Sequence, residues 1–243
     1  ILVYNYRTDK YEQPDTDFPT DVRTMVLQGD TLWIGSLNGL YTYQLKSRQL
    51  NHFDSKQTGL PHNTIYSIIH TKDNQIYIGT YNGLCRYVQA SGKFENILLP
   101  VNRGGSNLFV NSLLEDTTQQ CIWIGMEGYL FQYNPTTGEM KAIEVFHNNS
   151  IKSLALDGDE NLLAGTDNGL YVYQNDKEPL QHIIHDSRNI QSLTNNIIWN
   201  IFSDQEHNIW LGTDYGISLS RYNSALQFVQ ISQITGTGDG NQL

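Results

Sequence analysis

Trp33-Ile34-Gly35 is the stretch that decides the fold, because it returns four more times along the 243-residue chain. The later copies are Tyr77-Ile78-Gly79, Trp123-Ile124-Gly125, Leu163-Ala164-Gly165 and Trp210-Leu211-Gly212. Successive glycines of these copies are 44, 46, 40 and 47 residues apart. A second glycine follows after four residues at Gly39, Gly83, Gly169 and Gly216, and after three at Gly128. This regular recurrence indicates a repeat architecture.

Each copy has the pattern of four short strands, which the second copy shows best. Its strands are predicted over residues 64–70, 75–80, 84–89 and 94–98, and they are separated by turn residues such as Lys72-Asp73-Asn74 and Ser91-Gly92-Lys93. No stretch of the chain has a sustained helical period, which excludes a solenoid of helical hairpins. A single sandwich would not repeat its Trp-Ile-Gly unit five times.

We therefore expect an all-β fold, a β-propeller of four-stranded antiparallel blades. The chain would supply a partial ring of five full blades plus two strands of another. The sequence predicts a single domain over residues 1–243, with a partial blade at 1–16, full blades at 17–57, 58–102, 103–147, 148–190 and 191–232, and a linker at 233–243.

The conserved positions within the repeat have separate expected roles. The glycine after the aromatic residue is expected to permit close approach between blades or strands. The second glycine is expected to supply a positive φ in the turn before the third strand. Trp33, Trp123 and Trp210 recur in register and are predicted to be core residues, whereas Trp199 lies outside that register.

The composition limits the classes of partner. A net charge of −10 disfavours nucleic acid and anionic membranes. No apolar run approaches the ~18 residues of a membrane span, so direct membrane insertion is not expected. The chain starts within the apolar stretch Ile1-Leu2-Val3-Tyr4, and we expect it to belong to a longer protein. Cys85 and Cys121 are expected to be buried free thiols, with a disulfide between them left open.

The segment Asp204-Gln205-Glu206-His207-Asn208-Ile209-Trp210-Leu211-Gly212-Thr213-Asp214-Tyr215-Gly216-Ile217 resembles the two-component-regulator propeller repeat. Residues 73–80 and 83–87 match the same pattern, as does the segment Ser192-Leu193-Thr194-Asn195-Asn196-Ile197-Ile198-Trp199. The resemblance extends over nearly the whole chain. The fourth copy departs from it, with Leu163 in place of the aromatic residue, and the third copy lacks one turn residue.

This resemblance implies the periplasmic sensor region of a hybrid two-component histidine kinase of Bacteroidetes. Such a region would be non-catalytic, would bind an oligosaccharide and would regulate polysaccharide-utilisation genes. It implies as partners the other propeller and β-sandwich domains of the same parent chain, and it permits a homodimer.

No catalytic constellation is evident in the sequence. Of the seven histidines only His182 and His185 are close in sequence, and one pair does not make a metal site. The segment Asp157-Gly158-Asp159-Glu160 has some likeness to an acidic calcium loop, but it occupies an ordinary turn between the first and second strands. Neither a cofactor nor a metal site is predicted.

Comparison of the five copies points to one variable position in the first strand of each blade. The positions around it are uniform: one is β-branched, another is apolar, and a third is small or polar (Thr24, Ser67, Ser112, Ser153, Asn200). The variable position reads Arg23, Tyr66, Asn111, Lys152 and Trp199. Aromatic rings can stack on pyranose faces while amides and cations bond hydroxyls or carboxylates, so these side chains suit a sugar.

The turns between the second and third strands should open on the same rim, and we add Tyr81, Glu127, Asp167 and Tyr215 to the candidate ligand-binding residues. Concave sites with convergent polar groups favour ligand binding. The variable position is also consistent with simple tolerance beside a wet channel. Two other functions stay open: a propeller lyase or glycosidase, for which Glu127 and Asp167 would be the rim acids, and a scaffold that binds only protein.

Overall fold

The computed structural model describes residues 1–14, 17–101, 108–143, 149–174 and 177–231. The chain divides into two compact units, unit 1 (residues 1–110) and unit 2 (residues 111–243). The predicted linker at 233–243 lies outside the described residues.

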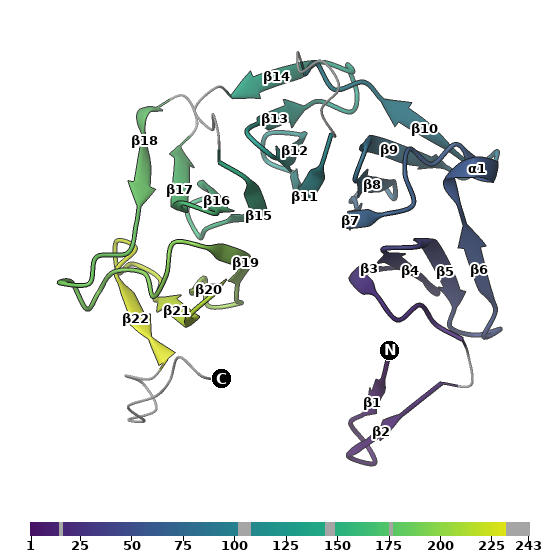
Figure 1. The fold of residues 1–243 in the computed structure, drawn as a ribbon, viewed down its shortest axis with the longest axis horizontal. Helices are drawn as coiled ribbons and strands as arrows, with labels where there is room; N and C mark the ends of the chain where they lie inside the picture. The colour runs from purple at the N-terminus through teal and green to yellow at the C-terminus, as the bar shows by residue number, and fades with distance from the viewer. Residues whose placement is uncertain (15–16, 102–107, 144–148, 175–176, 232–243) are drawn as a thin grey trace. The chain divides into compact units, whose positions relative to one another are not determined.

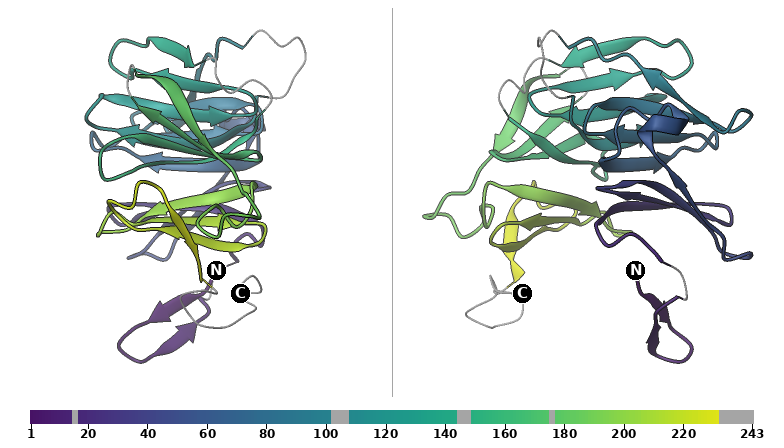
Figure 2. Two further views of the ribbon diagram at one scale, coloured as in Figure 1. Left: turned by 90° about the vertical axis from the view of Figure 1, so that its left-hand side faces the viewer. Right: turned by 45° about the vertical axis from the view of Figure 1, so that its right-hand side comes forward.

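Unit 1 contains two four-stranded antiparallel sheets and one short hairpin. The hairpin is β1 (Val3–Asn5) and β2 (Lys10–Glu12). The first sheet is β3 (Val22–Gln28), β4 (Thr31–Ser36), β5 (Gly39–Gln44) and β6 (Leu50–Phe53). The second is β7 (Ile65–His70), β8 (Ile76–Thr80), β9 (Gly83–Val88) and β10 (Lys93–Ile97). Figures 1 and 2 show the hairpin set apart from both sheets.

One short helix interrupts the strands of unit 1. The helix α1 (Ser55–Thr58) starts at Asp54, whose carboxylate accepts hydrogen bonds from the backbone N–H groups of Lys56 and Gln57. It ends at Gly59, which has a φ of 82°. A single turn is too short to produce a helical period in the sequence, which is why periodicity did not predict it.

Unit 2 contains three four-stranded antiparallel sheets. They are β11 (Val110–Asp116, which starts on the last residue of unit 1), β12 (Cys121–Met126), β13 (Leu130–Tyr133) and β14 (Met140–Ile143); β15 (Ile151–Leu156), β16 (Leu162–Thr166), β17 (Gly169–Gln174) and β18 (Lys177–Ile183); and β19 (Ile198–Ser203), β20 (Ile209–Thr213), β21 (Gly216–Ser220) and β22 (Phe228–Gln230).

The strands of every four-stranded sheet are paired in chain order, as Figure 1 shows for β15, β16, β17 and β18. Four antiparallel strands that meander across one sheet are a propeller blade. The described residues therefore form five full blades and a two-stranded sheet, which confirms the predicted fold class.

The hydrophobic core lies between consecutive blades of each unit. In unit 1, Trp33 and Leu40 of the first blade pack with Ile65 and Ile78 of the second. In unit 2, Trp123 packs with Leu154 of the next blade, and Leu163 with Ile198 of the one after it. Trp33 and Trp123 are buried as predicted, whereas Trp210 in the last blade is only half-buried.

The first glycine of the repeat permits the blades to approach one another, as predicted. A Cβ atom added to Gly35 would lie 2.6 Å from Ile65 Cγ2, and one added to Gly165 would lie 2.7 Å from Ile198 Cγ2. Gly79 and Gly125 have the same relation to Val110 and Ile151, each at 2.6 Å. From the second full blade onward, the β-branched residue that begins the first strand therefore packs directly on the glycine of the preceding blade.

The second glycine of the repeat adopts a positive φ in every copy, which confirms its expected role. The φ values are 126° at Gly39, 117° at Gly83, 76° at Gly128, 99° at Gly169 and 89° at Gly216. An L-residue with a side chain is disfavoured in this region, so the turn before the third strand requires glycine.

The two cysteines are free and buried, which confirms the expectation of free thiols. Burial raises the pKa of the Cys85 thiol and raises that of Cys121 to about 11. Both groups therefore remain protonated and unreactive near neutral pH.

Aspartates hold the turns between first and second strands. The Asp204 carboxylate accepts hydrogen bonds from the backbone of Glu206 and Asn208, from the Asn208 side chain, and from the indole N–H of Trp210 at 2.9 Å. These hydrogen bonds lower the pKa of Asp204 to about 2, and the bond from Trp210 has the largest effect. Asp116 is held in the same way by its own turn and by Trp123.

Replacing a glycine at which two blades are in contact should destabilise the packing between those blades. We expect Gly165→Ala to lower the free energy of unfolding of this chain by about 1–3 kcal/mol, because the new methyl group overlaps Ile198. Gly212 is the matched control: among the described residues its added Cβ would meet only Asn200 Cβ, at 3.9 Å. Gly212→Ala should therefore change stability by less than about 0.5 kcal/mol in urea unfolding. Equal losses in both variants would contradict this account.

The lowered pKa of Asp204 predicts a contribution to acid stability. The carboxylate stabilises the fold at pH values above the ordinary pKa of Asp, and this contribution is lost as the pH falls toward about 2. Asp204→Asn should lower the melting temperature near neutral pH, and the difference from the unmodified chain should shrink as the pH falls toward 2. A difference that stays constant across this range would show that the charge has no role.

Candidate functional site

In four of the five first strands the variable residue occupies a β-bulge. The pairing of β7 with β8 shifts between Ile65 and Ser67, and that of β19 with β20 shifts between Ile198 and Asn200. The same shift brackets Arg23 and Lys152. A bulge leaves one residue outside the ladder and redirects its side chain. The variability at this position therefore has a structural origin: the residue is released from pairing.

The residues beside the bulge explain why the neighbouring positions are uniform. The small polar residues form hydrogen bonds between consecutive blades of each unit. Ser112 Oγ accepts from Leu154 N at 3.1 Å, and Ser153 Oγ accepts from Ile201 N at 3.0 Å. These contacts tie the first strands together, so the positions flanking the bulge serve packing.

All five variable residues are at least partly accessible. Arg23 and Trp199 are exposed, while Tyr66, Asn111 and Lys152 are half-buried. Asn111 is partly committed to structure, because its side-chain amide donates to the Ile151 carbonyl at 3.0 Å. The accessible residues belong to both units, so we describe each group within its own unit.

In unit 1 the structure brings Tyr66 and Tyr81 together around Phe109. The ring centroid of Phe109 lies 4.3 Å from Tyr81, edge to face, and 6.2 Å from Tyr66. His62 lies 4.8 Å from Tyr81 on its other side, and its Nδ1 accepts from Thr64 N at 3.0 Å. Phe109 and His62 were not predicted as site residues. Each precedes the first strand of its blade, and the comparison of the five copies was made within those strands.

In unit 2 the structure brings Lys152 and Trp199 together from consecutive blades. Lys152 Nζ lies 4.3 Å from the centroid of the Trp199 ring, within the range of a cation–π interaction. The indole Nε1–H of Trp199 donates to a carboxylate oxygen of Asp214 in the turn between β20 and β21. Trp199 is nevertheless 56% exposed. We name this group of Lys152, Trp199 and Asp214 the tryptophan platform.

Asp214 was not among the predicted site residues, although it is adjacent to Tyr215. Two residues before the second glycine the repeat has Tyr81, Asp167 and Asp214 in three of its copies, and this signal does not distinguish a contact from a turn preference. Tyr215 itself is 61% exposed, and its backbone N–H donates to Thr213 Oγ1.

Glu127 and Asp167 both lie beside Ser150. Glu127 forms an isolated backbone bridge with Ser150, and Asp167 Oδ1 accepts from Ser150 N at 3.0 Å. The Asp167 carboxylate is thus already engaged with the backbone, while both side chains remain exposed. Within the described parts of the chain, no group of three or more His, Cys, Asp or Glu side chains is arranged to hold a metal ion.

A histidine fixes the turn that carries Asp167. His182 Nε2 lies 2.6 Å from the Asn168 carbonyl oxygen, and its ring stacks on Tyr171 with centroids 4.1 Å apart. The first blade repeats this arrangement with His52, Tyr41 and the Asn38 carbonyl. Each of these histidines positions a turn of its own blade.

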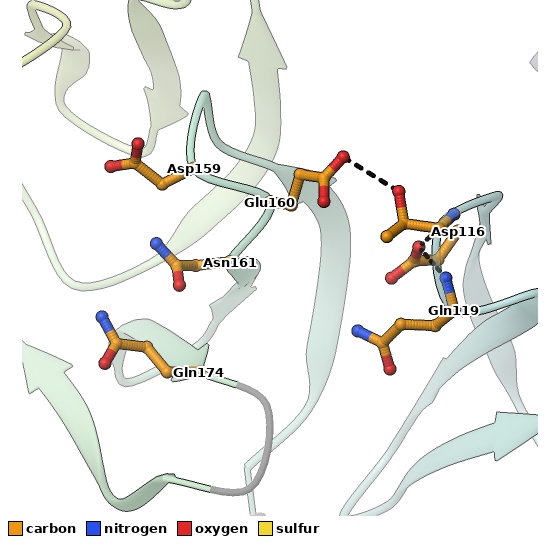
Figure 3. Close-up of a pocket in the computed structure, with 7 residues that line it drawn as sticks. Asp116, Gln119, Asp159, Glu160, Asn161 and Gln174 are labelled. Atoms are coloured by element: carbon orange, nitrogen blue, oxygen red, sulfur yellow. Dashed lines mark hydrogen bonds between the residues drawn. The ribbon is translucent and has the colours of Figure 1, made fainter.

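Unit 2 also contains a cavity at the opposite ends of its first strands from the tryptophan platform. Its volume is about 430 Å³, and it lies between the turn after β11 and the turn after β15. The described residues that line it are all polar: Asp116, Thr118, Gln119, Asp159, Glu160, Asn161 and Gln174. The Thr118 hydroxyl donates to Glu160 Oε1 at 2.9 Å, and Figure 3 draws this hydrogen bond as the dashed line at Glu160. The sequence analysis noted the likeness of residues 157–160 to an acidic calcium loop but assigned them to an ordinary turn.

The family model described as two component regulator propeller matches residues 59–82 and 192–215. Two crystal structures of the extracellular domain of one B. thetaiotaomicron protein, described as a hybrid two-component system or a one-component system, are 80% and 81% identical to this chain. Each covers 98% of the chain with a TM-score of 0.89. A second such domain from B. thetaiotaomicron is 23% identical, with a TM-score of 0.71 over 86% of this chain and 29% of its own, and supports the fold alone.

Histidine kinase P4 of Formosa agariphila is 26% identical over 195 residues, which are 74% of this chain and 14% of that protein. The chain spans 32% of the two more similar solved domains. These two solved structures are extracellular domains, in agreement with the periplasmic location that the family resemblance implies. No helix within the described ranges has the length and apolar character needed to cross a membrane.

The tryptophan platform predicts a measurable change when its acceptor is removed. In Asp214→Ala the Trp199 indole N–H loses its partner, so its NMR resonance should move upfield and its exchange with solvent should accelerate. The Trp123 indole, which donates to Asp116, is the internal control and should not change. An unchanged Trp199 signal would show that Asp214 does not hold the ring.

Proposed function

Because the chain belongs to the two-component-regulator propeller family, we propose that it is a periplasmic, non-catalytic ligand-sensing module of a hybrid two-component sensor kinase. Its ligand is an oligosaccharide, and binding regulates polysaccharide-utilisation genes. The extracellular domains at 80% and 81% identity and the histidine kinase relative support the sensor assignment. The partners are further propeller and β-sandwich domains of a longer chain.

The observation that carries the ligand proposal is the tryptophan platform. An exposed indole loses hydration when it packs on an apolar face, and the C–H face of a pyranose is such a surface. Trp199 is held before any ligand arrives, because Asp214 fixes its N–H edge and Lys152 covers one face. Ordering the ring in advance reduces the entropy that binding would otherwise cost.

The residues around the platform supply polar contacts suited to sugar hydroxyls. The Lys152 ammonium group keeps donors beyond its cation–π contact, since it carries three N–H groups. Tyr215 is exposed in the turn that also holds Asp214. In unit 1 the half-buried Tyr66 and the exposed Arg23 are further candidates for ligand contact, each on its own bulge.

The catalytic alternative receives no support from the rim acids. A glycosidase would need two carboxyl groups free to act on either side of a glycosidic bond. Asp167 already accepts a backbone hydrogen bond from Ser150. Asp167 is therefore better explained as a residue that shapes the turn beside Ser150, and Glu127 alone does not supply the required pair.

The oligosaccharide proposal is tested by thermal-shift screening of the intact protein against plant, host and microbial oligosaccharides. For a glycan that stabilises the protein, Trp199→Ala should weaken binding at least about tenfold, which corresponds to about 1.4 kcal/mol. Phe202→Ala is the matched control, because Phe202 is a 62% exposed aromatic residue of the same strand and lies outside the bulge.

Two outcomes would contradict the proposal. Absence of stabilisation by every glycan would argue against an oligosaccharide ligand. An unchanged glycan response in both Trp199→Ala and Arg23→Ala would remove the variable position from the site, and a protein-binding scaffold would then be favoured.

A further inference from the structure

The polar cavity of unit 2 has rigid walls. The Asp116 carboxylate is 1% exposed and accepts from the backbone N–H groups of Thr118 and Gln119 and from the Trp123 indole. On the facing blade, Asp157 accepts from the backbone of Asp159 and Asn161 and from the Asn161 side chain. Both turns are thus fixed by buried or half-buried carboxylates. The backbone that carries the lining side chains is therefore held in place before a ligand arrives.

The lining of the cavity is rich in acceptors and contains amides. Glu160 uses one oxygen for the Thr118 hydroxyl, which leaves the other available. Within the described residues, neither the Asp159 carboxylate nor the Gln174 amide has a hydrogen-bond partner. An ionised carboxylate only accepts hydrogen bonds, whereas an amide both donates and accepts. The lining therefore favours a ligand that is rich in donors.

The volume and charge of the cavity further limit the class of ligand that it can bind. About 430 Å³ lies within the usual range for small-molecule sites. Among the side chains that the structure describes, no Lys or Arg lines the cavity, and an anionic sugar would be repelled by Asp159 and Glu160. A lining without aromatic or aliphatic side chains also disfavours an apolar ligand.

A second, smaller hollow of about 90 Å³ adjoins the cavity at Asp159, which lines both. It contains Tyr222, 43% exposed, whose ring lies 5.3 Å from that of His207. Gly158 makes room for this ring, because an added Cβ would lie 2.5 Å from Tyr222 Cε2. Arg221 also lines this hollow. A ligand unit bound in the cavity could therefore extend past Asp159 onto an aromatic surface.

We propose that this cavity is a second ligand site that binds an amino sugar unit. The ammonium group of the sugar lies against Glu160 and Asp159, and its ring hydroxyls bond the amides of Gln119, Asn161 and Gln174. An adjacent unit of the chain extends toward Tyr222. This site is separate from the tryptophan platform and does not depend on it.

The proposal is tested by isothermal titration calorimetry of the intact protein with the β-1,4-linked disaccharide of glucosamine. Cellobiose and the N-acetylated disaccharide are the neutral controls, and the experiment is done at about pH 6, below the ordinary pKa of an amino group. We expect the glucosamine disaccharide to bind at least tenfold more tightly than either control. Its binding should shift the side-chain amide NMR signals of Asn161 and Gln174.

Glu160→Gln should reduce this preference at least fivefold, because it removes the charge while keeping an acceptor for Thr118. Glu139→Gln is the matched control: Glu139 is an exposed acid of the neighbouring blade that does not line the cavity, and its removal should leave binding unchanged. Trp199→Ala should also leave binding unchanged.

Three results would overturn the proposal. The first is no binding of the glucosamine disaccharide, and the second is equal affinity for cellobiose. The third is loss of binding in Trp199→Ala with none in Glu160→Gln, which would assign the ligand to the tryptophan platform. That third result would leave the proposed sensing function intact, so failure of the two proposals can be distinguished.

Discussion

The contact on which the structure depends is a β-branched side chain packed against a glycine of the preceding blade. Ile198 occupies the space that a Cβ of Gly165 would need, and Ile65 does the same at Gly35. This contact sets how closely the first strands of consecutive blades approach. The buried clusters around Ile65 and Ile198, and the serine hydrogen bonds between first strands, all require that approach.

The bulge follows from the same constraint. In the last blade both residues that flank the variable position are committed to the preceding blade: Ile198 packs on Gly165, and Asn200 Oδ1 accepts a hydrogen bond from Ser153 Oγ. The pairing shifts between these two residues. Trp199 is thereby released from the ladder. The position most free to change is thus placed, by the packing on both sides, where a ligand can reach it.

Much of this organisation could be predicted from internal repetition. Five copies separated the uniform positions from the variable one, and they identified which glycines serve packing and which serve a turn. The partners of Trp199 could not be predicted in this way. Lys152 and Asp214 lie 47 and 15 residues away in sequence, and their contacts depend on how two blades and a turn meet. The polar cavity was missed for a similar reason, because its walls come from two turns of ordinary composition.

The carboxylates of the tryptophan platform and those of the polar cavity have different structural roles. At the platform, Asp214 holds the edge of an aromatic ring, and the binding surface is the ring itself. At the cavity, the carboxylates of Asp116 and Asp157 accept hydrogen bonds from the backbone of their own turns. The carboxylates of Asp159 and Glu160 line the open space. The acidic residues that give the chain its net charge of −10 therefore have different roles. Some acids stabilise turns, one orients an aromatic ring, and a few remain to select the charge of a ligand.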